Sequence, residues 1–250
     1  AAVGVGNTAK LSVGIVSAYQ LYGDGSNLTG LSGFTPDEQQ NLYAGTDAGA
    51  ASDSDTCFNV AIGYKAGASN CSGGCNVFIG NCAGRQVTSG SCNIFLGRAG
   101  ENVTTGNFNI AIGNDTGGSA TTSTGEYNIS FGDYAGCCLT SGQANIFIGK
   151  DAGKQNKNGD DNIFMGRYTG CATQGGQYNI GIGANIMVKS GTKACNVVIG
   201  RFAGCCLSTG CSNVFLGYAA GRNTCTGDCN VAIGPHVCLA SANGDGQLAI

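Results

Sequence analysis

Tryptophan is absent from this 250-residue chain, histidine occurs once and proline twice. Charged residues make up only 11% of the chain, and the net charge is −3. This charge gives no basic face for nucleic acid and no polybasic segment for a membrane surface. No apolar run approaches the ~20 residues of a membrane-spanning helix, and the first residues lack the charged and apolar regions of a signal peptide. We therefore expect no nucleic-acid partner and no membrane insertion.

Residues suited to catalysis or metal binding are equally sparse. The single His236 has no partner at a spacing typical of a catalytic set. The carboxylates of Glu126, Asp160 and Asp161 fall in predicted turns, where a solvated side chain is expected instead of the paired carboxylates of a glycosidase. The cysteines do not follow the CxxC spacing of zinc sites. The sequence predicts no enzyme, no cofactor and no metal.

Glycine is the abundant residue, with 45 in 250 against an average near 7%. It does not recur at every third position, which excludes collagen. It belongs instead to a repeat of Asn, a β-branched residue, a variable residue, an aliphatic residue and Gly, as in residues 93–97. The asparagine occurs at Asn59, Asn76, Asn93, Asn109, Asn128, Asn145, Asn162, Asn179, Asn196, Asn213 and Asn230. The spacings are 17, 17, 16 and 19 residues and then six of 17, which is typical of a solenoid.

Each repeat is expected to form one coil, in which positions are counted from the asparagine. Apolar residues at +1 and +3 have period 2 and predict a strand, and Gly at +4 predicts a turn. Coils with two or three short strands, stacked one inter-strand spacing apart, give an all-β parallel β-solenoid of about 12 coils. We expect it to occupy residues 41–250, with the last repeat truncated. Residues 1–40 are expected to form a turn-rich lead-in or cap with a short helix from Thr35 to about Asn41.

The eleven asparagines are expected to form a structural ladder. Stacked in register, each side-chain amide bonds to the same amide one coil away, and each bond contributes about 1 kcal/mol net. A ligand or glycan site is the alternative, and it requires the side chains to lie outside the coil. The regularity of the column favours the ladder.

Position +2 is predicted to face outward, because +1 and +3 are expected to fill the coil. This column is Phe in five of eleven coils and polar only at Ser130, and a continuous apolar stripe of this kind marks an interface. We expect identical chains to pack through it around a shared axis, with a subunit interface formed by Phe78, Phe95, Phe147, Phe164, Val198 and Phe215. The alternative is a wider coil whose core takes both faces of the strand.

The fifteen cysteines are an odd number, so at least one per chain is unbridged or joined to another chain. Cys75 and Cys92 occupy the same phase in successive coils, which predicts a Cα separation of ~5 Å, within the range of a disulfide. Cys211 and Cys229 are similarly placed, and these four residues are the candidate disulfides of an oxidising setting. Buried thiols are the alternative.

The repeat Gly-x-x-Asn-Ile/Val-x-Ile/Leu-Gly-x-x-Ala-Gly resembles the head repeats of trimeric autotransporter adhesins and, more closely, the repeats of tail-fibre and other virion-fibre proteins of marine cyanophages. Residues 21–31, Leu-Tyr-Gly-Asp-Gly-Ser-Asn-Leu-Thr-Gly-Leu, are similar to a motif of those phage fibres. The resemblance implies a left-handed β-roll and a homotrimer, with the chains intertwined or side by side. The high cysteine content departs from both families.

The function implied by this resemblance is structural. The chain is expected to be the trimeric shaft or head of a phage tail or virion fibre involved in host attachment, located in the extracellular virion. Its partners are then identical chains and a host-surface glycan or protein receptor. A bacterial cell-surface adhesin or extracellular filament subunit is the alternative.

Overall fold

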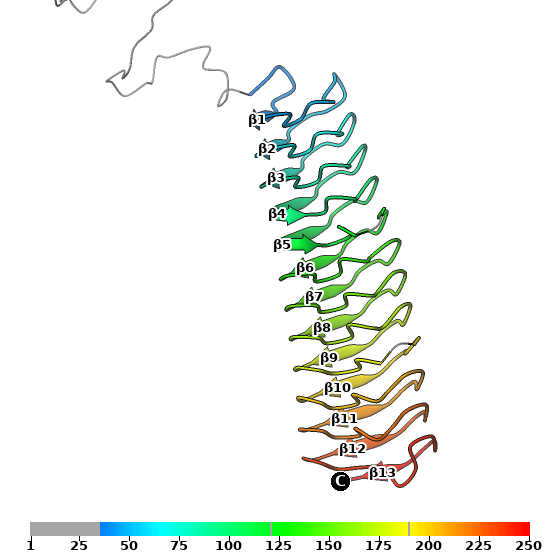
Figure 1. Ribbon diagram of the computed structural model, residues 1–250. Coiled ribbons are helices and arrows are strands. Elements are labelled where there is room, and N and C mark those ends of the chain that lie inside the picture. The colour runs from blue at the N-terminus through cyan, green and yellow to red at the C-terminus, as the bar shows by residue number, and fades with distance from the viewer. Residues whose placement is uncertain (1–35, 121, 190) are drawn as a thin grey trace, which may run out of the picture. The chain divides into compact units, whose positions relative to one another are not determined.

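The computed structural model describes residues 36–120, 122–189 and 191–250, and every regular element in them is a β-strand. The strands are β1 (Leu42–Ala44), β2 (Val60–Ile62), β3 (Val77–Ile79), β4 (Ile94–Ala99), β5 (Ile110–Thr116), β6 (Ile129–Phe131), β7 (Ile146–Ile148), β8 (Ile163–Met165), β9 (Ile180–Ile182), β10 (Val197–Ile199), β11 (Val214–Leu216), β12 (Val231–Ile233) and β13 (Leu248–Ala249). They form one parallel sheet in which each strand pairs with the next along the chain (Figure 1). The all-β parallel solenoid predicted from the repeat is confirmed.

The coils stack in the register of the sequence repeat. Phe78 in β3 pairs with Phe95 in β4, and Phe147 in β7 pairs with Phe164 in β8. Equivalent repeat positions therefore lie directly above one another. The two irregular spacings keep this register at position +2, where Phe95 in β4 pairs with Ala111 in β5 and Ala111 pairs with Ser130 in β6. The register shifts only farther along β4, between Arg98 and Ala99.

Each coil contains one strand, whereas two or three were expected. The remainder of the coil is made of turns, with isolated parallel bridges at Val103–Ser123 and Thr173–Gly191. Glycine, serine and threonine in this arc favour turns over extended pairing. The coil is thus a single strand closed by a polar loop.

The interior of the solenoid is filled by position +2. Phe78, Phe95, Phe147, Phe164 and Phe215 have at most 1% of their surface exposed, and the rings of Phe78 and Phe95 stack with centroids 5.4 Å apart. The prediction that this column faces outward is wrong. Residues at +2 share the parity of the buried asparagine, so the same face of the strand carries both into the coil.

Glycine at position +8 makes room for these rings. Gly153 has φ +57, and a Cβ added there would lie 2.5 Å from Cδ1 of Phe147. The coil that begins at Asn179 reverses this arrangement: Gly181 replaces the aromatic residue at +2, and the side chain of Met187 at +8 fills the space instead. Bulk at one position is matched by its absence at the other, as close packing requires.

The asparagine ladder runs along the interior beside the aromatic column. Oδ1 of Asn128 accepts hydrogen bonds from the backbone N–H and from Nδ2 of Asn145, both at 3.0 Å. Nδ2 of Asn145 also donates to the carbonyl of Gly159 at 2.7 Å. The same pattern recurs from Asn59 to Asn213 except at Asn76. At Asn76 and Asn230 the backbone N–H and the bond to the arc are kept. Each amide joins one coil to the last and ties its strand to the arc that closes it.

Residues 37–40 form a turn and not the end of the expected helix. The backbone N–H of Gln40 donates to the carbonyl of Asp37 at 3.0 Å, and Gln40 is left-handed with φ 65. Oδ1 of Asp37 accepts the N–H of Asn41 at 2.7 Å. This Asx-type turn leads directly into β1. The turn-rich motif at residues 21–31 and Thr35 lie outside the described residues.

Candidate functional site

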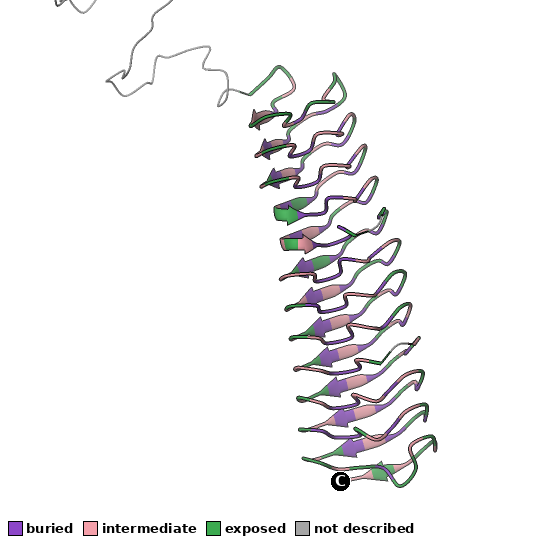
Figure 2. Cartoon of the chain, viewed as in Figure 1, coloured by how far each residue is buried: buried purple, intermediate pink, exposed green. Residues whose placement is uncertain are grey.

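The outer face of the sheet is the first candidate site. It consists of positions +1 and +3 in all thirteen coils, from Leu42 and Ala44 to Leu248 and Ile250, and we call it the outer sheet face. Every residue on it is Ala, Val, Leu, Ile, Met or Phe. Its members are intermediate or exposed, with 51% of Phe131 and 37% of Met165 accessible. Figure 2 shows the alternation with the buried +2 residue along the strands from β2 to β12.

Exposed aromatic residues border this face at position −1. Phe58, Phe108, Tyr127 and Tyr178 are about half exposed, and the rings of Phe108 and Tyr127 stack in parallel with centroids 5.1 Å apart. The backbone at this position is left-handed, with φ between 57 and 59 at these four residues. This conformation is costly for bulky side chains, and it turns them outward beside the sheet.

The size of the outer sheet face is that of an interface. Twelve inter-strand spacings by three residues give roughly 60 Å by 10 Å, or about 600 Å² in projection. Such an area is at the upper limit of the apolar patches found on monomers, which reach about 600 Å². An antiparallel or solvated sheet normally carries polar residues on its wet face, and none occurs at these positions.

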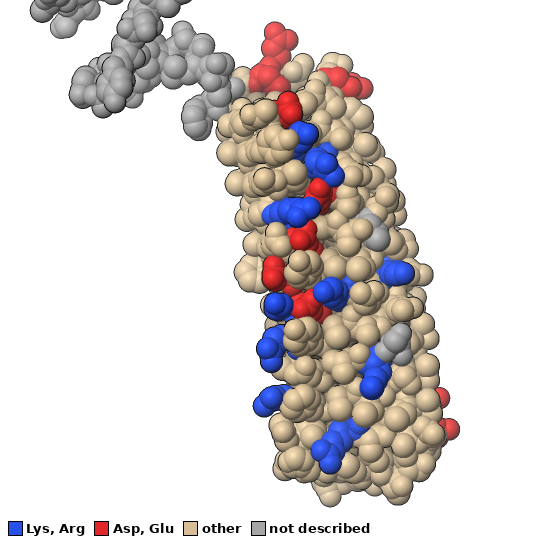
Figure 3. Space-filling model, in the orientation of Figure 1, with Lys and Arg blue, Asp and Glu red and all other residues tan. Residues whose placement is uncertain are grey.

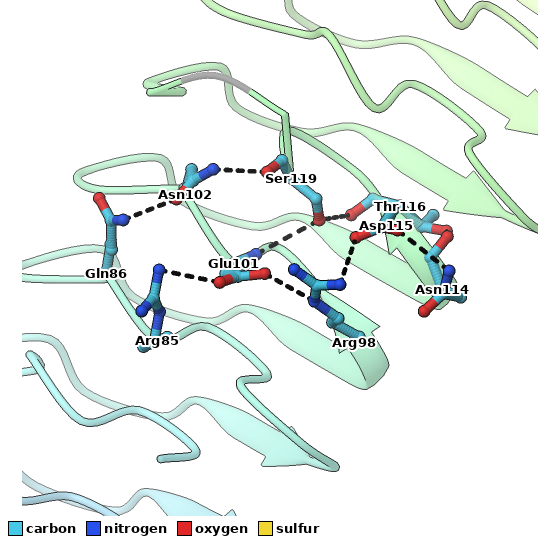
Figure 4. Close-up of polar contacts among 9 residues, drawn as sticks. All are labelled: Arg85, Gln86, Arg98, Glu101, Asn102, Asn114, Asp115, Thr116 and Ser119. Atoms are coloured by element: carbon cyan, nitrogen blue, oxygen red, sulfur yellow. Dashed lines mark hydrogen bonds and ion pairs between the residues drawn. The ribbon is translucent and has the colours of Figure 1, made fainter. Parts of the chain in front are cut away.

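Charged side chains gather elsewhere, in a band along the coils that Figure 3 shows. In its first half the charges are paired around Glu101, which is only 7% exposed. Arg85 and Arg98 each approach this carboxylate at 2.8 Å, and Arg98 also reaches Asp115 at 3.4 Å (Figure 4). The pairs bridge the coils with irregular 16- and 19-residue spacings, so their role is to hold neighbouring coils together.

Shallow clefts follow the same band. One of about 410 Å³ is lined by Arg98, Asp115, Tyr134 and Lys154, among others. A second of about 390 Å³ is lined by Asp151, Lys154 and Tyr168. The two clefts share Lys154, whose Nζ lies 2.7 Å from Oδ1 of Asp151. They are successive parts of a groove that runs parallel to the solenoid axis.

Two adjacent thiols border this groove. Sγ of Cys137 and Sγ of Cys138 are 3.5 Å apart, which is too far for a disulfide. A hydrogen bond from Cys137 and the nearby ammonium groups of Lys154 and Lys157 lower the pKa of Cys138 to about 6, while the hydrogen bond to Cys138 and burial raise the pKa of Cys137. Within the pair, deprotonation is favoured at Cys138, and the thiolate is the reactive form of cysteine.

A lysine is buried in the coil that closes before Asn196. Lys193 stands where other coils have the closing glycine, and its Nζ donates to Oγ1 of Thr173 at 3.2 Å and to the carbonyl of Lys189 at 2.6 Å. Burial lowers the pKa of Lys193 to about 8. No carboxylate forms an ion pair with it among the described residues, so its charge is held by neutral oxygens.

The four candidate disulfide cysteines are not bridged. All fifteen cysteines lie in the described part of the chain, and no disulfide joins any of them. Cys75 and Cys92 do stack in neighbouring coils, where burial and the adjacent Cys75 raise the pKa of Cys92. Cys211 and Cys229 are linked through the backbone, as the N–H of Cys229 donates to the carbonyl of Cys211 at 2.9 Å. Stacking alone leaves Cβ atoms about one inter-strand spacing apart, wider than the ~3.8 Å of a disulfide.

The predicted interface residues and the asparagine ladder both lie inside the coil, so neither is a surface site. The outer sheet face and the groove were missed. Parity with the buried asparagine is the signal that could have identified the face. Within the described residues no group of three or more metal-ligating side chains occurs, and no helix is long and apolar enough to span a membrane. Comparison with protein-family models, characterised proteins and solved structures finds no match to this chain.

Proposed function

We propose that this chain is a structural fibre protein whose solenoids assemble as a homotrimer through the outer sheet face. The observation that carries the proposal is the uninterrupted apolar surface along all thirteen coils, from Leu42 to Ile250. Covering about 600 Å² of apolar surface is worth roughly 15 kcal/mol before the costs of association. The translational and rotational cost of association is about 4–15 kcal/mol, so burial of the whole face is of the size needed to offset it.

A second copy of the chain is the partner that fits this surface best. It offers an apolar stripe of the same length, with ridges at the same spacing of ~4.8 Å. Closed cyclic assemblies are the usual outcome when identical chains share one surface, and a flat face on each chain meets two others around a three-fold axis. The trimer and its left-handed β-roll geometry are part of the proposal.

Within this proposal the fibre is the shaft or head of a phage tail or virion fibre that attaches to a host. Rigid rods of stacked coils suit such a role, since each coil adds length without changing the cross-section. The partner at the host surface is a glycan or a protein receptor. A bacterial cell-surface adhesin or filament subunit is the second candidate, and it is favoured by the same repeat.

No catalytic role is included in the proposal. The buried carboxylates Glu101 and Asp151 are engaged in ion pairs with Arg85, Arg98 and Lys154. Structural bridging accounts for both residues.

The test is the native mass in solution, measured by sedimentation or light scattering with and without reductant. A mass three times the 24.9 kDa of the chain, kept under reductant, is the expected result. The variant Phe131→Asp/Met165→Asp places charges on the outer sheet face and should yield a folded monomer. The control Ser89→Asp/Ser141→Asp adds the same charges at exposed arc positions and should remain trimeric. A wild-type monomer, or a trimer lost only under reductant, would contradict the proposal.

A further inference from the structure

Position +6 carries an aromatic ring in every second coil of the C-terminal half. Tyr134, Tyr168, Phe202 and His236 are each 34 residues apart, which is two coils. The rings therefore recur at roughly 10 Å along the axis. All four have left-handed backbone, with φ between 56 and 62, so their positions are fixed by the coil. The ring of Tyr218 lies between the last two of these rings. Its centroid is 6.1 Å from that of Phe202 and 4.9 Å from that of His236.

Cations accompany these rings. Lys154 lies 4.6 Å from the ring centroid of Tyr134, Arg167 lies 5.4 Å from that of Tyr168, and Arg201 lies 4.6 Å from that of Phe202. Arg167 and Arg201 are exposed, and no ion pair engages either of them within the described residues. Arg98 in the first half of the band is, by contrast, neutralised by Glu101 and Asp115. The C-terminal half therefore presents two unpaired cations beside aromatic rings, Arg167 and Arg201, whereas in the described N-terminal coils Lys65, 5.2 Å from the ring centroid of Tyr64, is the single such case.

The groove described above lies against the same column. Tyr134 lines one cleft and Tyr168 lines the next, with Lys154 common to both. The rings repeat at one interval along this surface, and unpaired cations lie beside the second and third of them, at Arg167 and Arg201. A compact ligand would use one interval, whereas a linear polymer would use all of them.

We infer that the column Tyr134, Tyr168, Phe202 and His236, together with Arg167 and Arg201, binds an extended anionic polysaccharide running parallel to the solenoid axis. The roughly 10 Å interval is of the order of one disaccharide unit in an extended chain. Aromatic rings offer apolar faces to the C–H faces of sugars, and guanidinium groups bind carboxylate or sulfate through paired hydrogen bonds. This inference rests on the proposed attachment function and names the class of its receptor.

A polysaccharide fits this surface better than a single-stranded nucleic acid. Nucleic acids carry a phosphate at every residue and are bound by densely cationic grooves. Here the net charge of the chain is −3. Among the described coils, position +5 carries an exposed cation only at Arg98, Lys150, Arg167 and Arg201, and Arg98 is already paired with Glu101 and Asp115. Sparse cations match a polymer whose charges are spaced along a neutral backbone.

The experiment measures binding of the full chain, in its native assembly state, to alginate, polygalacturonate and dextran sulfate by isothermal titration calorimetry. Neutral cello-oligosaccharides and a single-stranded oligothymidylate serve as comparison ligands. The variant Tyr168→Ala/Phe202→Ala should weaken binding of the acidic polymer at least tenfold. Arg167→Gln/Arg201→Gln should weaken it and flatten its dependence on salt. The control Phe108→Ala/Tyr127→Ala removes an exposed aromatic pair from another face and should bind as the wild type does.

Absence of binding to all three acidic polymers would overturn the inference, as would equal binding of the neutral oligosaccharide. Tighter binding of the oligothymidylate than of the acidic polysaccharides would assign the aromatic column to nucleic-acid binding instead. Circular dichroism of each variant establishes that it is folded. A trimer that binds no polysaccharide would contradict only the polysaccharide inference and leave the fibre proposal supported. A monomer that binds one would contradict only the trimer, so the two proposals can be tested separately.

Discussion

Removing one amide from the middle of the asparagine ladder should cost far more than removing an exposed one. Asn145→Ala deletes four hydrogen bonds: two donated by Nδ2, to Asn128 and Gly159, and two accepted by Oδ1 from Asn162. Nδ2 of Asn162 keeps its bond to Gly176. Two buried groups are left without a partner, the backbone N–H of Asn162 and the carbonyl of Gly159.

The expected loss follows from those two groups. Each unsatisfied buried backbone group costs roughly 1–3 kcal/mol, so the variant should lose about 4 kcal/mol of unfolding free energy. The control is Asn114→Ala, which removes an exposed amide bonded only to the neighbouring Asp115. A surface substitution of this kind should change stability by less than about 0.5 kcal/mol.

Urea unfolding followed by circular dichroism, at one fixed protein concentration, measures both variants. Hydrogen exchange of the amides on either side of residue 145 complements it, because repeat stacks can open locally. Asn145→Ala should expose the amide of Asn162 to rapid exchange and leave the distant coils protected. Equal stability of the two variants would show that the ladder contributes no more than a surface amide, and the structural role assigned to it would be wrong.

Two further predictions concern the core. Gly153→Ala should lower the unfolding free energy by about 2 kcal/mol, because φ is +57 and the new Cβ would meet the Phe147 ring. The control Gly175→Ala, where only Thr192 lies within 4 Å, should be nearly neutral. Equal melting temperatures of the two variants would contradict this prediction. Lys193 has a pKa of about 8 in the fold against 10.5 for an unperturbed lysine, so the unfolded chain binds one more proton between these values and stability rises with pH there. Lys193→Met should be more stable than the wild type at pH 7, and the difference should shrink from pH 8 to 10.5; a constant difference in urea unfolding would refute the effect.

The coil stack and the ladder followed from periodicity alone, because a 17-residue repeat with period-2 apolar residues has few other solutions. Periodicity alone did not predict which face of the strand points into the coil. Both of its faces are apolar, with Phe95 on one and Ile94 and Leu96 on the other, so alternation of polarity carries no information. Asn93 does carry it: a buried amide at one position places the residue two further on, Phe95, in the same interior.

The polar arc resisted prediction for a different reason. Its residues have no apolar period, and their contacts depend on which coils are neighbours. Glu101 meets Arg85 across the 16-residue difference between them, and Lys193 takes a glycine position with its ammonium turned inward. The cysteine columns show the same limit, since phase predicted that Cys75 and Cys92 would stack but not how their side chains point.

Length is the property that this stack leaves open to evolution. Each strand contacts only the strand before it and the strand after it, and each lies in the register of its neighbours. Duplication of the coding sequence for one whole coil would lengthen the rod by ~4.8 Å and leave every existing contact intact. Loss or gain of a residue within Ile146–Ile148 would instead exchange the interior and exterior faces of that coil. Duplication or deletion of whole coils can therefore change the length of the rod in fixed steps of one repeat without altering its cross-section.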